Sequence, residues 1–535
     1  MVAVATMTQM VVMVGFFISW FKMTDFRSGD QLKNKGNTTW MPVIFRTTVN
    51  YDCVVRYFFC AVRLPHRMPV ILWMKLFISA VGFAMCFSSL VLAIEKPNVI
   101  LVMADDLGYQ DLGCYDHPEI KTPVLDKLAA GGVRFTDFHS GATVCTPSRM
   151  ALLTGAYPTK LGWTQGVVGY KMGKHDGMSG RALTIAEIFK SEGYATGMSG
   201  KWHIGDQPDT DPNAQGFDSF YGLLMSNNQT KELLRDGKVI ENPFENRLLT
   251  EKFTTEAIRF VRKNKENPFF LYIPHTAPHF PVEPHPDWKG KSSFGKYGDV
   301  VEEIDARMGE LLGELKKLGL EKKTIVVFCS DNGPNPREKA NCLPYRGEKW
   351  SALEGGTRVP CIISWPDKLA AGKTYAGLTS AMDLLPTLSE ACGIDWRKKS
   401  KGQPKIDGLS IWQSLHGKAD HPRNELLLWH GMEAEPQSIR VGEWKLFFDR
   451  RHALEGLGAR RKTKQQAEKI MPYIDGLKKD QPNPPILFNV AKDPGETTDL
   501  NEKFPDKVKE LTERADQLMK QMRSHGILPL SVPGK

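Results

Sequence analysis

The chain has 535 residues, of which 41% are hydrophobic and 24% are charged, and its formal net charge at pH 7 is +9. This length is enough for one large domain and a smaller one, and the composition is ordinary for a soluble globular enzyme. The basic excess is mild, so it permits an anionic substrate without requiring one. The basic clusters 397–399 and 460–462 contain no aromatic residues, which favours solvated loops and predicts no nucleic-acid partner.

The first 93 residues are expected to precede the folded enzyme. Met74 and Lys75 open an apolar run, 76–92, that ends at Ala93, and this pattern is typical of a secretory signal peptide over residues 74–93. A membrane-anchored N-terminus is the weaker alternative because the run is short for a span. Residues 1–73 carry no visible chemistry and are interpreted as a leader from a mis-assigned start. We therefore expect an exported protein (periplasmic, secreted or lysosome-like), with no stable membrane insertion after signal cleavage.

Short apolar runs alternate with helical patterns from residue 94 to residue 400. The runs 97–103, 268–273 and 323–328 are rich in branched or aromatic residues, as in buried strands of a parallel sheet. Helical spacing of apolar residues is found at 122–130, 184–192, 253–264 and 300–318. This alternation predicts an α/β catalytic domain over residues 94–400, with a mixed, mostly parallel sheet sandwiched by helices.

The pattern changes in residues 401–535, where the apolar segments are shorter. The segments 425–430, 438–441 and 444–448 resemble antiparallel strands, and Gly442 with Glu443 is a plausible hairpin turn. Helical spacing follows at 506–523, and the polar, basic stretch 457–479 is expected to be a surface insertion. We therefore predict a small C-terminal α+β subdomain with a short antiparallel sheet.

Polar side chains follow four runs of the large domain, at the points where strands should end. They are Asp105 and Asp106, then Lys201 to His203, then His275 to His279, and finally Asp331 with Asn332. In open parallel sheets, ligands bind where the carboxyl ends of strands meet, so these groups are expected at one edge.

Asp105, Asp106, Asp331 and Asn332 offer oxygen ligands only. Crowded carboxylates repel one another unless a cation neutralises them, and oxygen donors without thiolates favour Ca²⁺ or Mg²⁺ over Zn²⁺. An isolated Asp is more simply explained as a cap of the following loop. Two acidic pairs at two strand ends favour a metal site instead.

Cys145 lies next to Pro147 and the helical pattern 148–154, so its side chain is expected at a helix N-terminus, where anions bind well. Arg149 follows one helical turn later, and Lys201 and His203 point the same way if their segment is extended. Taken alone, Cys145 is more simply a small core residue, and the cations are ordinary surface charges.

Seven motifs together resemble those of type I sulfatases of the alkaline phosphatase superfamily. The most specific is Cys-x-Pro-Ser-Arg at 145–149 with Leu-Thr-Gly at 153–155. The others are the segments 98–109, 193–205, 277–281, 330–333 and 349–356, with a C-terminal hallmark at 487–496. The similarity extends from about residue 96 to residue 501.

This resemblance implies that Cys145 is oxidised to formylglycine by a separate formylglycine-generating enzyme. It implies one Ca²⁺, with Mg²⁺ less favoured, held by the four oxygen-donor residues above and the modified Cys145. Arg149 and Lys201 would hold the aldehyde hydrate, and His203 would accept its proton.

His279 and Lys349 would bind the sulfate and protonate the leaving alcohol. His279 is preferred over His275 because it lies in the Ala-Pro-His-Phe-Pro match.

The resemblance predicts a sulfuric ester hydrolase that acts on an aryl or carbohydrate sulfate through a covalent sulfo-enzyme. Its substrate would be a sulfated small molecule or glycan. The nearest alternative is a phosphatase or phosphonate-ester hydrolase of the same superfamily. A second is an inactive protein that binds sulfated glycans.

Overall fold

The computed structural model describes residues 96–164, 166–169, 176–429, 435–454 and 482–530. The predicted leader, the predicted signal peptide and the expected insertion 457–479 lie outside these residues. From Ile94 onward the chain forms one compact unit. Among the described residues, no helix combines the length and apolar character needed to cross a membrane.

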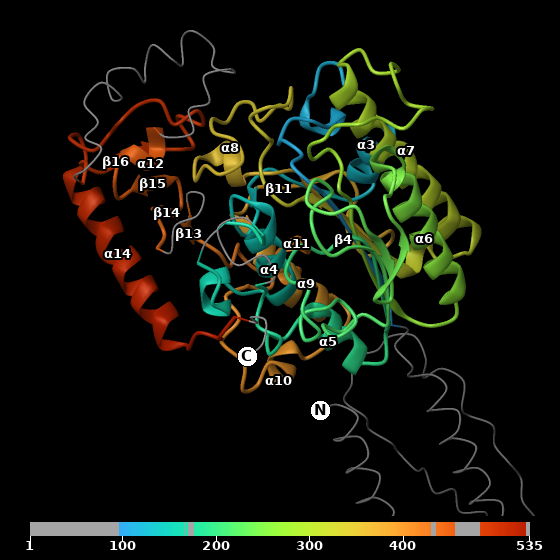
Figure 1. Cartoon of the computed structure of the whole chain (residues 1–535). Helices are drawn as coiled ribbons and strands as arrows, with labels where there is room; N and C mark the ends of the chain where they lie inside the picture. Colours follow the sequence, from blue (N-terminus) through green and yellow to red (C-terminus); the bar gives the residue numbers. More distant parts are fainter. Residues whose placement is uncertain (1–95, 165, 170–175, 430–434, 455–481, 531–535) are drawn as a thin grey trace, which may run out of the picture. The chain divides into compact units, whose positions relative to one another are not determined.

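A ten-stranded sheet organises this unit (Figure 1). Its strand order is β11-β2-β10-β9-β1-β8-β4-β5-β6-β7. The central pairs, β9-β1, β1-β8, β8-β4 and β4-β5, are parallel, whereas β10, β6 and β7 pair antiparallel with their neighbours. The prediction of a mixed, mostly parallel sheet is therefore confirmed. The strands are β1 (Asn98–Ala104), β2 (Val133–Phe135), β4 (Ala195–Lys201), β5 (Ser219–Leu223), β6 (Leu233–Arg235), β7 (Lys238–Glu241), β8 (Phe269–Pro274), β9 (Thr324–Ser330), β10 (Cys361–Ser364) and β11 (Lys373–Tyr375).

Helices cover both faces of the sheet, and the central strand β1 shows why. Because successive side chains of a strand point to opposite faces, its odd-numbered residues from Val99 to Met103 and its even-numbered residues from Ile100 to Ala104 join separate cores. The first core includes residues of α4 (Cys145–Thr154), α5 (Ile185–Ser191) and α9 (Leu384–Ala391). The second includes residues of α3 (Pro123–Ala130), α6 (Leu249–Lys263) and α7 (Lys296–Lys317) (Figure 1).

The C-terminal region, residues 401–535, contains a four-stranded antiparallel sheet in the order β13-β14-β15-β16. Its elements are β13 (Glu425–Leu428), β14 (Ser438–Val441), β15 (Trp444–Phe447), β16 (Ile486–Asn489) and α14 (Pro505–Ser524). Val441 pairs with Trp444, so Gly442 and Glu443 form the two-residue turn, and Gly442 has the positive φ of 55° that such a turn requires. Helix α14 buries Leu511 and Ala515 in the same core as this sheet. The predicted antiparallel sheet is confirmed.

Small elements complete the unit. They are β3 (Phe138–His139), which pairs with β12 (Thr379–Ser380), and the one-turn helices α8 (Glu354–Thr357), α10 (Trp396–Lys399), α11 (Trp412–Leu415) and α12 (Arg451–Leu454). Helices α6 and α7 each begin four residues before the predicted starts at 253 and 300, because periodicity does not define the first turn of a helix. Cys329 and Cys361 are buried free thiols in the first core, as predicted.

Candidate active site

Four neighbouring strands, in the order β9-β1-β8-β4, end at one edge of the large sheet. Asp105 and Asp106 follow β1, Asp331 and Asn332 follow β9, and Lys201 is the last residue of β4. Backbone hydrogen bonds continue the strand pairing into this edge, since Asp331 N donates to Ala104 O at 3.2 Å and His275 N donates to Met103 O at 2.8 Å. The parallel sheet thus gathers side chains that lie more than 200 residues apart in the sequence.

Three buried ion pairs connect these side chains. Lys201 Nζ lies 2.6 Å from Asp105 Oδ2, and Lys349 Nζ lies 2.6 Å from Asp106 Oδ1. Arg149 donates to Asp331 Oδ2 through Nη2 at 2.7 Å.

The pKa values of Asp105 and Asp331 are shifted in opposite directions. Burial raises the pKa of Asp105, but Lys201, His279 and Arg149 outweigh it and hold that pKa well below its usual value. Burial, reinforced by the neighbouring Asp105, raises the pKa of Asp331 to about 7 despite Arg149. The surroundings therefore favour the ionised form of Asp105 but disfavour that of Asp331.

Two oxygen atoms at this edge suit a metal ion. Asp105 Oδ1 and Asn332 Oδ1 are buried and have no hydrogen-bond partner among the described residues. Asn332 Nδ2 donates to Asp106 Oδ1 at 2.7 Å, which leaves the amide oxygen available. Buried oxygens are normally paired, so two unpaired ones beside three carboxylates fit a hard cation that accepts only oxygen ligands.

Cys145 is the first residue of α4 and is 2% exposed. It packs against Val144 and Val167, with the partly buried Trp350 beside them. Burial raises the pKa of the Cys145 thiol, although the nearby Lys201 and Lys349 lower it. The encoded side chain is therefore a protonated thiol and a poor nucleophile at neutral pH.

His203 lies just beyond β4 and takes the left-handed backbone conformation, with φ 63°. Neither of its buried ring nitrogens has a hydrogen-bond partner among the described residues. Burial, with the nearby Lys201 and Arg149, holds its pKa well below the usual value. Its carbonyl accepts a 2.8 Å hydrogen bond from Thr146 Oγ1, which ties this loop to α4. A neutral imidazole with free nitrogens can accept a proton.

His279 and His275 have different surroundings. His279 Nδ1 lies 2.6 Å from the Phe280 carbonyl oxygen, and its Nε2 lies 3.8 Å from Asp106 Oδ2. His275 is buried with its ring 6.4 Å from that of Phe253. Burial lowers the pKa of both to about 4, and Lys349 adds to this effect at His279. Of the two, His279 is the one in contact with the acidic cluster.

Two further residues of this edge were not predicted. Asn335 Nδ2 lies 3.5 Å from Asp106 Oδ2, and Trp350 has a φ of 82°, which is uncommon for a residue with a side chain. Trp350 N donates to Thr143 O at 2.9 Å, which joins its segment to the residues before Cys145. The sequence offers one indication of a role for Trp350, which is that it directly follows Lys349.

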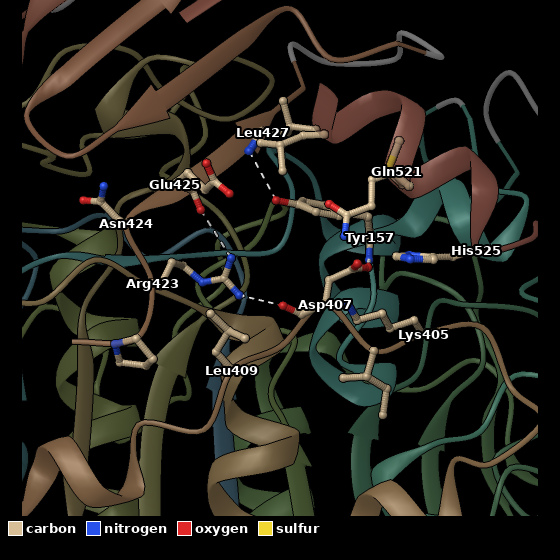
Figure 2. Close-up of a pocket in the computed structure, with 14 residues that line it drawn as sticks. Tyr157, Lys405, Asp407, Leu409, Arg423, Asn424, Glu425, Leu427, Gln521 and His525 are labelled. Atoms are coloured by element: carbon tan, nitrogen blue, oxygen red, sulfur yellow. Dashed lines mark hydrogen bonds between the residues drawn. The ribbon is translucent and has the colours of Figure 1, made fainter. Parts of the chain in front are cut away.

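A separate cavity of about 380 Å³ lies between the Tyr157–Asp407 contact, β13 and α14 (Figure 2). Arg423 Nη2 donates to Asp407 O at 2.9 Å inside it, and Leu427 N donates to Tyr157 Oη at 3.2 Å. None of the predicted site residues lines this cavity. This cavity is therefore separate from the predicted site.

Comparisons with known proteins agree with this geometry. The sulfatase family model matches residues 97–394, and the model of the C-terminal region of aryl-sulfatase matches residues 421–526. Human arylsulfatase A is 33% identical over 76% of this chain and 83% of its own length. Human steryl-sulfatase is 29% identical over 79% and 88%. The crystal structure of Ps i-CgsB in complex with k-i-k-neocarrahexaose is 29% identical, with a TM-score of 0.64 over 79% of this chain and 92% of that one.

The family models together cover most of the described residues, and the aligned relatives are sulfatases that hydrolyse sulfate esters. The chain therefore belongs to the sulfatase family and is a sulfuric ester hydrolase.

Proposed function

We propose that the protein hydrolyses its sulfate ester with a formylglycine at position 145. The observation that carries this proposal is the position of Cys145: it starts α4 and lies in the electrostatic field of Lys201, Lys349, Asp105 and Asp331. An anionic sulfate group would meet helix N–H groups and two ammonium groups there. A protonated thiol gains nothing from these surroundings, whereas an aldehyde hydrate does.

Asp105, Asp106, Asp331, Asn332 and the modified residue 145 would hold one Ca²⁺, with Mg²⁺ less favoured. The unpaired Asp105 Oδ1 and Asn332 Oδ1 support this ligand set. When bound, the ion would polarise a sulfate oxygen and favour deprotonation of the attacking hydroxyl.

The reaction would proceed in two halves. In the first, one hydroxyl of the hydrated aldehyde attacks sulfur, the bond between sulfur and the alcohol oxygen breaks, and the alcohol leaves with a proton. Arg149 and Lys201 hold the hydrate and offset the developing negative charge. In the second, His203 takes the proton of the remaining hydroxyl, sulfate leaves and the aldehyde forms again. Water then restores the hydrate.

Lys349 is the better placed proton donor for the leaving alcohol. Burial lowers its pKa, but Asp106 outweighs burial and raises it, so the ammonium group carries its proton at neutral pH. The neutral His279 ring has its proton on Nδ1, because that atom faces the Phe280 carbonyl. His279 Nε2 can donate to a sulfate oxygen only after protonation, which the arriving anion would favour.

We infer that the alcohol is a carbohydrate rather than an aryl group. The surface next to His279 includes the polar side chains of Asn227, Asn246, Thr250 and Glu283. Asn227 Nδ2 already donates to Asn246 Oδ1 at 2.8 Å, so the Glu283 carboxylate is the group of this surface that would accept a hydrogen bond from a sugar hydroxyl. The sulfatase relatives cover several alcohol classes, including steryl-sulfatase and the Ps i-CgsB structure with k-i-k-neocarrahexaose. A higher kcat/KM on sulfated oligosaccharides than on aryl sulfates is expected.

The proposal includes how the protein matures. The signal peptide would direct export with cleavage after Ala93, and a formylglycine-generating enzyme would modify Cys145. The mature chain would consist of the catalytic domain, residues 94–400, and the C-terminal subdomain, residues 401–535.

Peptide mass spectrometry of tryptic fragment 135–149, from protein made in its native host, tests the proposal. A mass that corresponds to an aldehyde in place of the thiol is expected. An unmodified cysteine in protein with phosphoesterase activity would instead support the related phosphatase reaction. An unmodified cysteine without any esterase activity would support a binding function.

A further inference from the structure

Lys349 lies on a segment, residues 346–357, that belongs to no strand of the large sheet and ends in the short helix α8. Its backbone is closed on itself, because Gly355 N donates to Arg346 O at 2.7 Å and Gly356 N donates to Leu353 O at 3.0 Å. Lys349 N donates to Pro334 O at 2.9 Å. Gly333 N also donates to Gly356 O at 3.0 Å, so the loop after β9 holds one side of the segment.

Both ends of the segment are bound to the C-terminal region. At one end, Arg346 Nε donates to Gly495 O at 2.8 Å and Arg346 Nη1 donates to Ala453 O at 3.1 Å. At the other, Glu354 N donates to Glu496 Oε2 at 2.7 Å. These bonds join residues 107 to 149 positions apart in the sequence, so they form only when the C-terminal region is folded in place.

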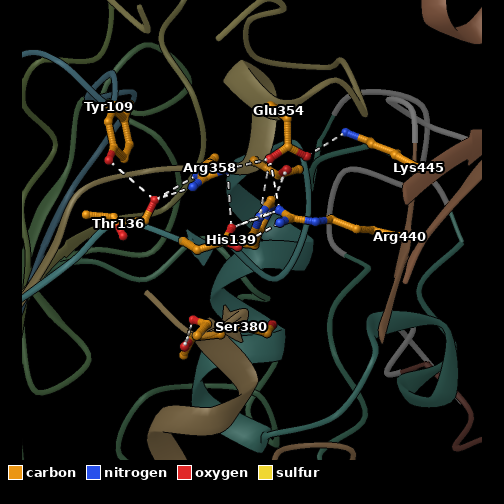
Figure 3. Close-up of polar contacts among 12 residues, drawn as sticks. Tyr109, Thr136, His139, Glu354, Arg358, Ser380, Arg440 and Lys445 are labelled. Carbon is orange, nitrogen blue, oxygen red and sulfur yellow. Dashed lines mark hydrogen bonds and ion pairs between the residues drawn. The ribbon is translucent and has the colours of Figure 1, made fainter. Parts of the chain in front are cut away.

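The Glu354 carboxylate is the centre of the second attachment (Figure 3). It is fully buried and lies 3.0 Å from Lys445 Nζ on β15 and 3.0 Å from Arg440 Nη1 on β14. Arg358 Nη1, one turn further along the chain, lies at the same distance. Burial raises the pKa of Glu354, but Lys445 and Arg440 outweigh it and hold that pKa well below the usual value. The carboxylate is therefore ionised, and both β-strands hold it.

This network does not resemble a metal site, although Asp137, His139 and Glu354 lie close enough to share an ion. Arg440 Nη1 already lies 2.8 Å from Asp137 Oδ1, 2.9 Å from His139 Nε2 and 3.0 Å from Glu354 Oε2. The guanidinium group thus occupies the position where these three ligands converge. Buried ion pairs add little net stability compared with apolar packing. The main effect of these pairs is therefore to fix the positions of the groups that they join.

We propose that the C-terminal region positions Lys349 for catalysis, because Lys445 and Arg440 hold Glu354 and thereby fix the segment that places the Lys349 ammonium group beside Asp106. This inference rests on the proposed role of Lys349 in protonating the leaving alcohol. Lys445 and Arg440 are positioning residues, since they act through Glu354 and reach neither Asp106 nor Cys145 in any contact of the described residues.

The test is a set of steady-state measurements on the matured full-length enzyme with Lys445→Met. Displacement of a catalytic group by about 1 Å lowers turnover by roughly 100-fold, so we expect kcat to fall between about 10- and 100-fold. KM should change by less than about threefold, because the sulfate-binding groups at the strand ends are untouched. Lys445→Arg, which keeps the charge, should restore most of the turnover.

A double-mutant cycle separates positioning from general damage. In a Lys349→Ala background, Lys445→Met should lower kcat no further, because the group that it positions is absent. A merely structural effect would lower kcat by the same factor in both backgrounds. Additive effects would therefore overturn the proposal.

Arg423→Met is the matched control. Arg423 is also buried and also joins the C-terminal region to the large domain, through Asp383 at 2.6 Å, but it has no contact with residues 346–357. Its loss should lower thermal stability by a similar amount while kcat of the folded enzyme changes by less than about twofold.

If Lys445→Met does not fold, Lys445→Met with Glu496→Gln replaces it, because this pair removes both charges of the 3.0 Å contact between Lys445 and Glu496. Unchanged kcat in that variant, with Lys349→Ala impaired, would overturn the positioning role alone. Unchanged kcat in Lys349→Ala would instead overturn the proposed role of Lys349.

Discussion

The sheet edge and the Glu354 network are two buried clusters in which carboxylates pair with cations, but polar atoms are left without a partner mainly at the edge. At the edge, Asp105 Oδ1 and Asn332 Oδ1 have no hydrogen-bond partner among the described residues, and neither does the His203 ring. In the network, the carboxylates of Asp137, Glu354 and Glu496 each lie within 3.0 Å of a cationic nitrogen.

The difference shows what distinguishes a reactive site from a structural one. Both clusters contain acidic groups close enough together to share a metal ion. At the sheet edge, the unpaired oxygen and nitrogen atoms can bind a metal ion or an anion, or accept a proton. In the other, Arg440 already occupies the shared position. Residue composition and distances alone do not distinguish the two clusters. The hydrogen-bond partners of each buried polar atom do distinguish them. Changes at the edge should therefore act directly on the chemistry, whereas changes in the network should lower stability and affect turnover only through the position of Lys349.

The largest effect is expected for Cys145→Ser at the edge. A serine hydroxyl can attack sulfur, but it lacks the second hydroxyl that would expel sulfate. Multiple turnover should fall by roughly three orders of magnitude or more, as for other lost nucleophiles, while the fold stays intact. Intact-protein mass spectrometry after incubation with substrate should detect a trapped sulfo group. Normal multiple turnover by this variant would contradict the formylglycine mechanism.

Removal of metal should have the next largest effect and should distinguish the clusters directly. Chelation with EGTA should lower activity by about 100-fold or more, because a lost metal contact amounts to several kcal/mol of transition-state stabilisation. Added Ca²⁺ should restore the activity and raise the melting temperature. At about 100 times its Kd the stabilisation is about 2.7 kcal/mol.

The same Ca²⁺-dependent increase in melting temperature is expected for the Glu354→Gln variant, because the Glu354 network would bind no metal ion. Loss of the Ca²⁺-dependent increase in Glu354→Gln, with a normal increase in wild type, would show that the network and not the edge holds the metal.

The network is most directly broken by Glu354→Gln in a urea-unfolding experiment. The change leaves Arg440, Arg358 and Lys445 with a weaker acceptor in a fully buried position. Loss of one partner of a buried ion pair destabilises a protein by about 3 kcal/mol or more. The free energy of unfolding should fall by that amount, and the urea midpoint should move to a lower concentration. A shift of less than about 0.5 kcal/mol would mean that the network is not rigidly held.

The smallest effect concerns the pH dependence of stability at Asp137. Burial raises the pKa of this carboxyl, but Arg440 outweighs it and lowers the pKa from 3.8 to about 2. A depressed folded-state pKa contributes stability above the unfolded value, and that contribution is lost as the pH falls from about 4 towards 2. The difference in unfolding free energy between wild type and Asp137→Asn should be about 2 kcal/mol and constant between pH 7 and pH 5. This difference in unfolding free energy should become smaller below pH 4. A decrease that begins at higher pH would contradict the pairing of Asp137 with Arg440.

Much of the fold followed from local patterns. The runs before Asp105 and Asp331 are branched and apolar, and β1 and β9 form within one or two residues of their predicted bounds. Strand β4 is less evident, because its sequence ATGMSGK has no branched apolar run and the strand was expected only from the polar group Lys201 to His203 at its end. Its small residues permit close packing: a Cβ on Gly197 would lie 2.5 Å from the Phe260 ring, and one on Gly200 would lie 2.0 Å from Pro274 O. The neighbours, not the intrinsic preference, hold β4 in the sheet.

Some residues of the candidate site could be predicted from the sequence and others could not. The residues that carry its chemistry could be named from their types, their positions after strands and the motif at Cys145. The contacts of Trp350 and Asn335 could not, because neither residue follows a strand and both reach the site through irregular segments. Irregular backbone has no period from which a side-chain direction can be read.

The sequence by itself determined the α/β class, the antiparallel C-terminal sheet and the sulfatase motifs, because periodicity and residue type are local properties. The tertiary structure decided which oxygens stay unpaired and which cations reach Glu354. Arg440 and Lys445 lie 86 and 91 residues from Glu354 in the chain, and their contacts exist only because the C-terminal sheet lies against α8. Pairing between distant buried charges depends on that packing, so no local pattern can encode it.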